Sequence, residues 1–135
     1  ISKRGGEPVS MDELLARADF ITLHIPLTAE SRNMLNSEAF AKMKTGVRIV
    51  CAARGGVLDE AALLAALESG KVAAAGLDVF ATEPPGLTAL VSHPKVVAVP
   101  HMGGQTVEAQ ARAAGDISAE VLAALRGEPL RWKVA

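Results

Sequence analysis

The chain has 135 residues, half of them hydrophobic, and a formal net charge of −1 at pH 7, which together suit one globular domain with a sizeable core. The near-neutral charge, the absence of tyrosine and the lack of any apolar run of roughly 20 residues argue against a nucleic-acid surface, a base-stacking platform and a membrane span. The single cysteine, Cys51, excludes an internal disulfide and fits a reducing, cytoplasmic compartment.

The first half of the chain is predicted to alternate helices and strands. A Ser-x-x-Glu capping box that begins at Ser10 opens a short helix over residues 11–18. The run "DFITLHI" at residues 19–25 is rich in β-branched side chains and predicts a strand, which a proline stops. A helix over residues 36–44 and a strand over residues 47–53 follow.

The second half continues the alternation. An aspartate caps a helix over residues 60–69, and Gly70 stands in the usual place for a left-handed cap at its end. Two apolar runs, residues 72–80 and 95–100, are predicted strands. A long helix over residues 106–126 closes the chain and is ended by a glycine and a proline.

The predicted strands are nearly continuous apolar runs, not alternating ones. Such strands, separated by helices, are typical of a parallel sheet with both faces covered. We therefore expect an α/β fold built on four parallel strands with covering helices.

Polar side chains follow three of the predicted strands where each one ends. Arg54 follows the second strand, Asp78 and Glu83 come with the third, and His101 follows the fourth. Ligands of open parallel sheets bind beyond the carboxyl ends of the strands. We therefore expect these four side chains at one edge of the sheet.

Histidine titrates closest to neutral pH, so His101 is the best acid–base candidate. Glu83 can reach it if the third and fourth strands end close together, and a carboxylate beside an imidazole fixes its tautomer. The plainer readings are a loop histidine that caps the long helix, and a surface carboxylate before two prolines.

Arg54 offers a planar fork of donors that suits a carboxylate, but it could equally form a salt bridge to Asp59 or Glu60. Asp78 interrupts an apolar run, where a carboxylate is costly without a partner. That partner is either a ligand amide or a structural donor.

The remaining candidates for chemistry are weak. We expect Cys51 to be a small core residue, His24 to be packed or to line a wall, and His93 to lie on the surface. The three histidines show no ligand spacing, so no metal site is predicted. The sequence contains neither a Gly-x-Ser-x-Gly elbow nor a Walker phosphate loop.

Four stretches in order resemble one protein family. "ADFITLHIPLT", "VCAARGGVLDEAALLAAL", "AAGLDVFATEPP" and "VPHMGG" are similar to the NAD-dependent D-2-hydroxyacid dehydrogenases, and within them most to the phosphoglycerate dehydrogenases. The resemblance extends from about Ser10 to Arg126. It implies a Rossmann-type parallel sheet, NAD as cofactor, a small 2-hydroxy or 2-keto acid as substrate, and a homo-oligomer in the whole protein.

The resemblance also implies a role for each candidate. Arg54 would hold the substrate carboxylate, His101 would exchange the proton, and Glu83 would pair with His101. Asp78 would bind the nicotinamide carboxamide. The other residues implied to line the cofactor are Ile25, Pro26, Ala52, Ala53, Arg54, His101, Gly103 and Gly104.

One part of the family pattern is missing from these 135 residues, namely the Gly-x-Gly-x-x-Gly turn that binds the pyrophosphate. We therefore expect residues 1–135 to be the C-terminal half of a dinucleotide-binding domain, including the helix at about 106–126, with the glycine-rich first half and the substrate domain outside them. Alone, these residues are expected to be inactive and to expose strand 19–25 as an apolar edge.

Three alternatives remain open from the sequence. A glycerate/glyoxylate or D-lactate type of reductase would share every motif quoted above. A nucleotide-sensing, corepressor-like binding protein would keep much of the same site without turnover. The third alternative is a degenerate domain with no activity of its own.

Overall fold

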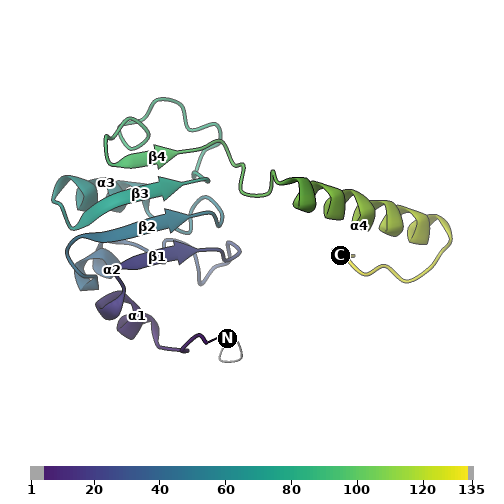
Figure 1. Cartoon of the computed structure of the whole chain (residues 1–135), viewed down its shortest axis with the longest axis horizontal. Helices are drawn as coiled ribbons and strands as arrows, with labels where there is room; N and C mark the ends of the chain where they lie inside the picture. Colours follow the sequence, from purple (N-terminus) through teal and green to yellow (C-terminus); the bar gives the residue numbers. More distant parts are fainter. Residues whose placement is uncertain (1–4, 134–135) are drawn as a thin grey trace. The chain divides into compact units, whose positions relative to one another are not determined.

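The structure is a computed structural model that describes residues 5–133, in two units that meet between His101 and Met102. The first unit contains three helices and a four-stranded sheet (Figure 1). Its helices are α1 (Met11–Arg17), α2 (Ser37–Lys42) and α3 (Glu60–Glu68). Its strands are β1 (Phe20–Leu23), β2 (Val47–Cys51), β3 (Val72–Leu77) and β4 (Val96–Ala98). No helix of the described residues is long and apolar enough to span a membrane.

The helices of this unit begin at the side chains that the sequence predicts. Ser10 Oγ accepts the Glu13 N–H (3.2 Å), Asn36 Oδ1 caps α2 in the same way, and Asp59 Oδ1 caps α3. Each oxygen satisfies a backbone donor that the first helical turn leaves open. Gly70 ends α3 with φ +77°, a conformation that costs glycine little.

The sheet is entirely parallel, with the strands in chain order β1-β2-β3-β4. Connections between neighbouring parallel strands are nearly always right-handed, so strands added in one direction place their connecting helices on one face. The core lies on that face, between the helices and the inward side chains of the strands. Its most deeply buried members include Leu35, Ile49, Leu63 and Leu67.

Within the unit that ends at His101, the helices cover one face of the sheet. Burial alternates along β1 and β2, and the opposite face leaves Phe20 70% exposed and Val97 68% exposed. The cause is the strand order, because a doubly covered sheet needs strands added in both directions from its centre. An apolar run alone cannot reveal which direction the chain takes.

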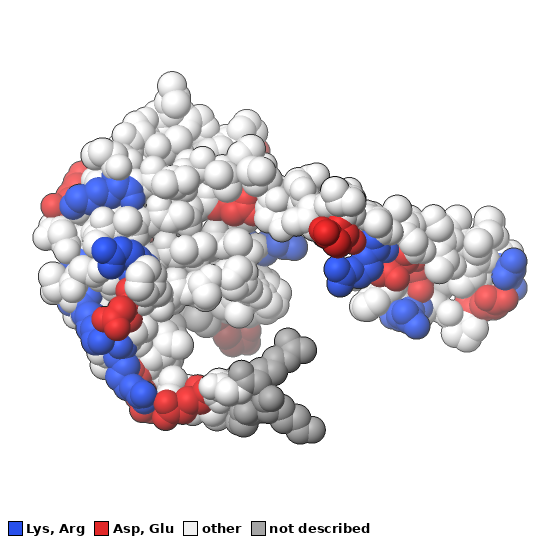
Figure 2. Space-filling model, in the orientation of Figure 1, with Lys and Arg blue, Asp and Glu red and all other residues white. Residues whose placement is uncertain are grey.

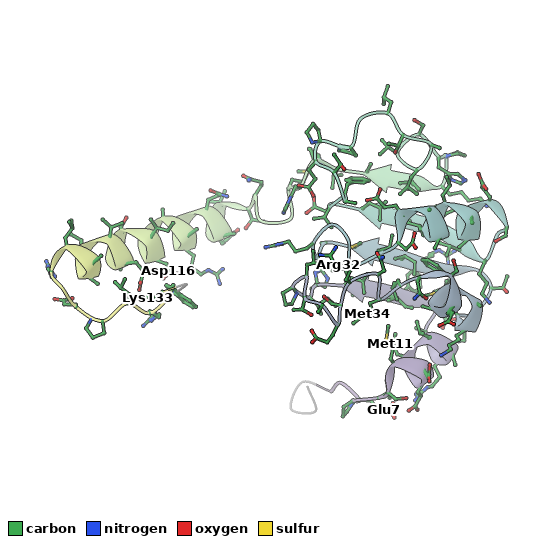
Figure 3. The ribbon with its side chains drawn as sticks, turned by 180° about the vertical axis from the view of Figure 1, so that it is seen from behind. Glu7, Met11, Arg32, Met34, Asp116 and Lys133 are labelled. Atoms are coloured by element: carbon green, nitrogen blue, oxygen red, sulfur yellow. The ribbon has the colours of Figure 1, made fainter. Side chains whose placement is uncertain are left out.

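The second unit contains helix α4 (Val107–Leu125) and the segment after it. Thr106 caps the helix, and Gly127, with φ +67°, ends it in a Schellman motif in which the Glu128 N–H donates to the Ala123 carbonyl. The segment then returns along α4. Figure 3 draws Lys133 beside Asp116, and both line one apolar hollow of this unit.

Candidate active site

The centre of the candidate site is a hydrogen-bonded pair, Glu83 and His101. The Nδ1 atom of His101 lies 2.8 Å from Glu83 Oε2. His101 lies three residues after the end of β4, and Glu83 lies in the loop between β3 and β4, which are neighbours in the sheet. The contact that the order of the strands predicted is therefore present.

The chemistry of the pair fixes the tautomer of the imidazole. An ionised carboxylate only accepts hydrogen bonds. Nδ1 of His101 therefore carries the hydrogen, and this N–H donates a hydrogen bond to Glu83. In the neutral ring, Nε2 then keeps its lone pair and can accept a proton from a substrate. The geometry therefore presents a general base with an oriented ring.

Glu83 is itself held in place by a second bond. Its Oε1 accepts the Phe80 N–H (3.0 Å), so each carboxylate oxygen has its own donor. Both bonds favour the charged form and hold the pKa of Glu83 below its ordinary value. The bond to His101 lowers this pKa most, and the positive charge of Arg54 lowers it least.

The pair lines a cavity of about 200 Å³ at the carboxyl ends of β3 and β4. Asp78, which is 8% exposed, contributes a third polar side chain to it. The remaining walls are apolar: Phe80, Pro84, Pro85, Val99 and Pro100. An apolar slot with a few polar groups at one side suits a flat organic ring that carries a polar substituent.

Arg54 lies outside this cavity, on the turn after β2. Its guanidinium donates to the carbonyl of Ala53 (2.7 Å), and the side chain is exposed. None of the ion pairs formed within residues 5–133 involves Arg54, so the alternative of a salt bridge to Asp59 or Glu60 is not realised. The guanidinium keeps donors for an incoming anion.

The other residues implied to bind the cofactor lie in two places. Ala52 and Ala53 continue from β2, and the Ala52 N–H donates to the Leu23 carbonyl (3.1 Å). Ile25 and Pro26 follow β1. Gly103 and Gly104 belong to the second unit, in the turn before α4.

Three other expectations concerned residues outside the site. Cys51 is buried in the core, as predicted, and burial raises the pKa of its thiol. His24 is exposed and bonds Thr22 Oγ1 (2.7 Å), so it is not packed, and its place on a wall of the site stays a prediction. Within the described part of the chain, no cluster of side chains could hold a metal ion.

The sequence interpretation missed the apolar wall and the role of Glu60. The sequence signal for the wall is the prolines beside the pair, because Pro84 and Pro85 follow Glu83 and Pro100 precedes His101. Glu60 appeared only as a rival partner for Arg54, whereas its Oε1 accepts the Ala81 N–H (2.6 Å). No local pattern indicates a bond between residues 21 positions apart.

On the face drawn in Figure 2, acidic and basic side chains are mixed, and neither sign of charge gathers in one large patch. The exposed ion pairs of the first unit include Lys42 with Asp12 and Lys44 with Asp19. Exposed pairs of this kind stabilise little, and their mixed sign favours no polyanionic partner.

Comparison with known proteins adds a family pattern and close relatives. The pattern described as D-isomer specific 2-hydroxyacid dehydrogenase, NAD binding domain, matches residues 1–103. The chain is 52% identical over 128 residues to D-3-phosphoglycerate dehydrogenase of Bacillus subtilis, a match that covers 95% of this chain and 24% of that protein. The chain thus spans about a quarter of the length of the curated relatives it resembles.

Solved structures agree with this similarity. A glyoxylate reductase from Paecilomyes thermophila superposes with a TM-score of 0.83 at 43% identity, covering 90% of this chain and 38% of that one. A D-lactate dehydrogenase with NAD+ from Lactobacillus jensenii superposes with a TM-score of 0.84 at 31% identity, covering 94% and 42%.

Proposed function

Because this chain belongs to the D-isomer specific 2-hydroxyacid dehydrogenase family, whose NAD-binding-domain pattern matches residues 1–103, we propose that the whole protein interconverts a D-2-hydroxy acid and its 2-keto acid with NAD. The observation that carries this proposal is the Glu83–His101 bond at the edge of a largely apolar cavity at the strand ends. We also propose that residues 1–135 are the C-terminal half of the dinucleotide-binding domain.

The residues of the cavity fit the nicotinamide end of NAD. Its apolar walls suit the ring, and the carboxylate of Asp78 suits the donors of a carboxamide. Ala52, Ala53, Ile25 and Pro26 would hold the cofactor further along the strand ends. When bound, NAD accepts or returns the hydride of the substrate carbon.

The chain's own residues supply binding and proton transfer. Arg54 holds the substrate carboxylate through its fork of donors, which fixes the carbon that carries the hydroxyl. His101 takes the hydroxyl proton at Nε2, and Glu83 stabilises the imidazolium that results. In the reverse direction, the same imidazolium gives the proton back to the keto oxygen.

For the substrate, we propose 3-phosphoglycerate. The support is the 52% identity to a phosphoglycerate dehydrogenase, against 43% and 31% to the glyoxylate reductase and D-lactate dehydrogenase structures. A panel of 2-hydroxy acids tested with the full-length protein and NAD should give its highest kcat/KM with 3-phosphoglycerate. A higher value with glycerate or D-lactate would reassign the substrate and leave the reaction type intact.

The site assignment is tested with His101→Asn and Arg54→Ala in the full-length protein. His101→Asn should lower kcat by about 10²- to 10⁴-fold, because it removes the general base. Arg54→Ala should lower kcat/KM by about 10- to 100-fold, the range of a lost hydrogen bond to a charged group.

Two residues of the same types serve as controls. His24 is exposed and bonded to Thr22, and Arg48 lies over the Phe20 ring at 5.3 Å. His24→Ala and Arg48→Ala should keep turnover near normal. Near-normal turnover in His101→Asn would contradict the mechanism, and NADH binding without turnover of any acid would favour the binding-protein alternative.

A further inference from the structure

The backbone between β3 and Glu83 is held by carboxylates from two directions. Glu83 Oε1 accepts the Phe80 N–H at 3.0 Å, and Glu60 Oε1 accepts the next amide, that of Ala81, at 2.6 Å. Glu60 is the first residue of α3, so it ties this loop to a helix that belongs to the core. The two bonds fix consecutive peptide groups immediately before Glu83.

The turn after Arg54 fixes the same segment from a third side. A Cβ atom on Gly55 would lie 1.9 Å from the Phe80 carbonyl oxygen, so the backbone of the turn and the backbone of the loop are in direct contact. Only glycine permits this approach. Arg54, Gly55 and Glu60 also surround one small cavity of about 10 Å³.

We propose that Glu60 is a positioning residue for the Glu83–His101 pair. It contacts neither partner, and it acts by holding Ala81, so that the Phe80 amide and the Glu83 carboxylate keep the geometry that orients the imidazole. This inference rests on the proposed function for its kinetic consequence, but its structural consequence can be measured without a substrate.

A competing role is that Glu60 serves only helix α3. A carboxylate in the first turn interacts favourably with the helix dipole, and Glu38, the second residue of α2, also lies in a first turn. The two roles require different properties of the side chain. The interaction with the helix dipole requires the negative charge. The hydrogen bond from Ala81 requires an acceptor oxygen on a side chain as long as that of glutamate.

Three substitutions separate these roles. Glu60→Gln keeps the length and an acceptor oxygen but loses the charge. Glu60→Asp keeps the charge but is one methylene shorter, and Glu60→Ala loses both. Glu38→Ala is the matched control, since it removes a first-turn carboxylate that makes no contact with the site.

In the full-length protein with NAD and its best 2-hydroxy acid, Glu60→Ala and Glu60→Asp should lower kcat by roughly 10- to 100-fold, because small misplacements of reacting groups carry such losses. Their KM for the acid should stay within about twofold, since Arg54 is untouched. Glu60→Gln and Glu38→Ala should stay close to the parent protein. A normal Glu60→Asp beside an impaired Glu60→Gln would overturn the proposal, as would normal kcat in Glu60→Ala.

A second readout needs no turnover. The pKa of the Glu83 carboxyl, followed by ¹³C NMR, should be below its ordinary value in the parent and should rise in Glu60→Ala and Glu60→Asp but not in Glu60→Gln. The charged groups that act on Glu83, His101 and Arg54, are unchanged in all three variants. An inactive parent would refute the proposed function alone. A Glu83 pKa that is the same in the parent and in Glu60→Ala would refute the positioning role.

Discussion

At the scale of single residues, the backbone of His101 is as informative as its ring. Its φ is +50°, in the left-handed region that few non-glycine residues occupy, and its N–H donates to the Val99 carbonyl (3.1 Å). This turn redirects the chain as it leaves β4. Asparagine tolerates the same region better than most residues, which is why His101→Asn removes the imidazole with the least disturbance of the backbone.

Glu83 gives a pH prediction with a defined sign. Its pKa is lowered in the folded protein, chiefly by the bond to His101. A lowered carboxyl pKa contributes stability above the unfolded value, about 4.3, and that contribution is lost as the pH falls through the folded pKa. The melting temperature of Glu83→Gln should therefore lie below that of the parent at pH 5 to 6.

The same comparison in acid provides the test. The difference in melting temperature should shrink as the pH falls below about 4. A difference that persists unchanged to about pH 2.5 would mean that the charged carboxylate of Glu83 is not its source.

The polar residues of the site could be predicted because of where they stand in the sequence. Arg54, Asp78, Glu83 and His101 follow apolar runs, and parallel strands bring their carboxyl ends to one edge. The second bond of Glu83 and the reach of Glu60 to Ala81 could not be predicted. Both depend on the path of an irregular loop, which periodicity does not describe.

At the scale of elements, we expect that the turn after β2 and the loop after β3 cannot move independently, because their backbones are in direct contact. Gly55→Ala would place a Cβ atom 1.9 Å from the Phe80 oxygen, so backbone must move. We expect a loss of roughly 1–3 kcal/mol or more in the free energy of unfolding, together with a large drop in kcat. Chemical denaturation and steady-state kinetics would measure both.

Gly76→Ala is the matched control for this prediction. A Cβ atom on Gly76 would meet only Val50 Cγ2, at 3.8 Å, which is ordinary contact. Its effect on stability should stay within about 1 kcal/mol. Equal losses in the two variants would show that the close approach at Gly55 is not what makes its substitution costly.

The boundaries of the elements were predictable to different degrees. The helices begin where the sequence predicts, because a capping side chain marks each start. The strands end earlier: β3 stops at Leu77, not at residue 80, because apolar side chains continue past the last paired residue. Which sheet face the helices of the first unit cover could not be predicted, since no single strand reveals the direction in which strands are added.

At the scale of the whole molecule, β1 is the outermost strand of the sheet on its side. Among the described residues it pairs with β2 alone, and it carries Phe20, which is 70% exposed. An apolar edge is a template for pairing with another chain. Residues 1–135 alone should therefore self-associate, which sedimentation velocity would detect.

Phe20→Glu tests whether that edge is responsible. Phe20 lies opposite Arg48 in the register of β1 and β2, so a glutamate there gains a cross-strand partner while it charges the edge. The variant should sediment as a smaller species than the parent. A parent chain that is monomeric and melts cooperatively would contradict the prediction.

The order of the strands also bears on how the site comes apart. Each strand pairs with the next strand in the chain, although the paired residues lie far apart in the sequence, as Phe20 and Arg48 do. β4 is the shortest strand, with three residues, and its only partner within residues 5–133 is β3. Its release would separate His101 from Glu83 while β1, β2 and β3 stay paired. Local opening of this kind requires less free energy than global unfolding. The proton-transfer pair therefore depends on the shortest strand of the sheet, β4.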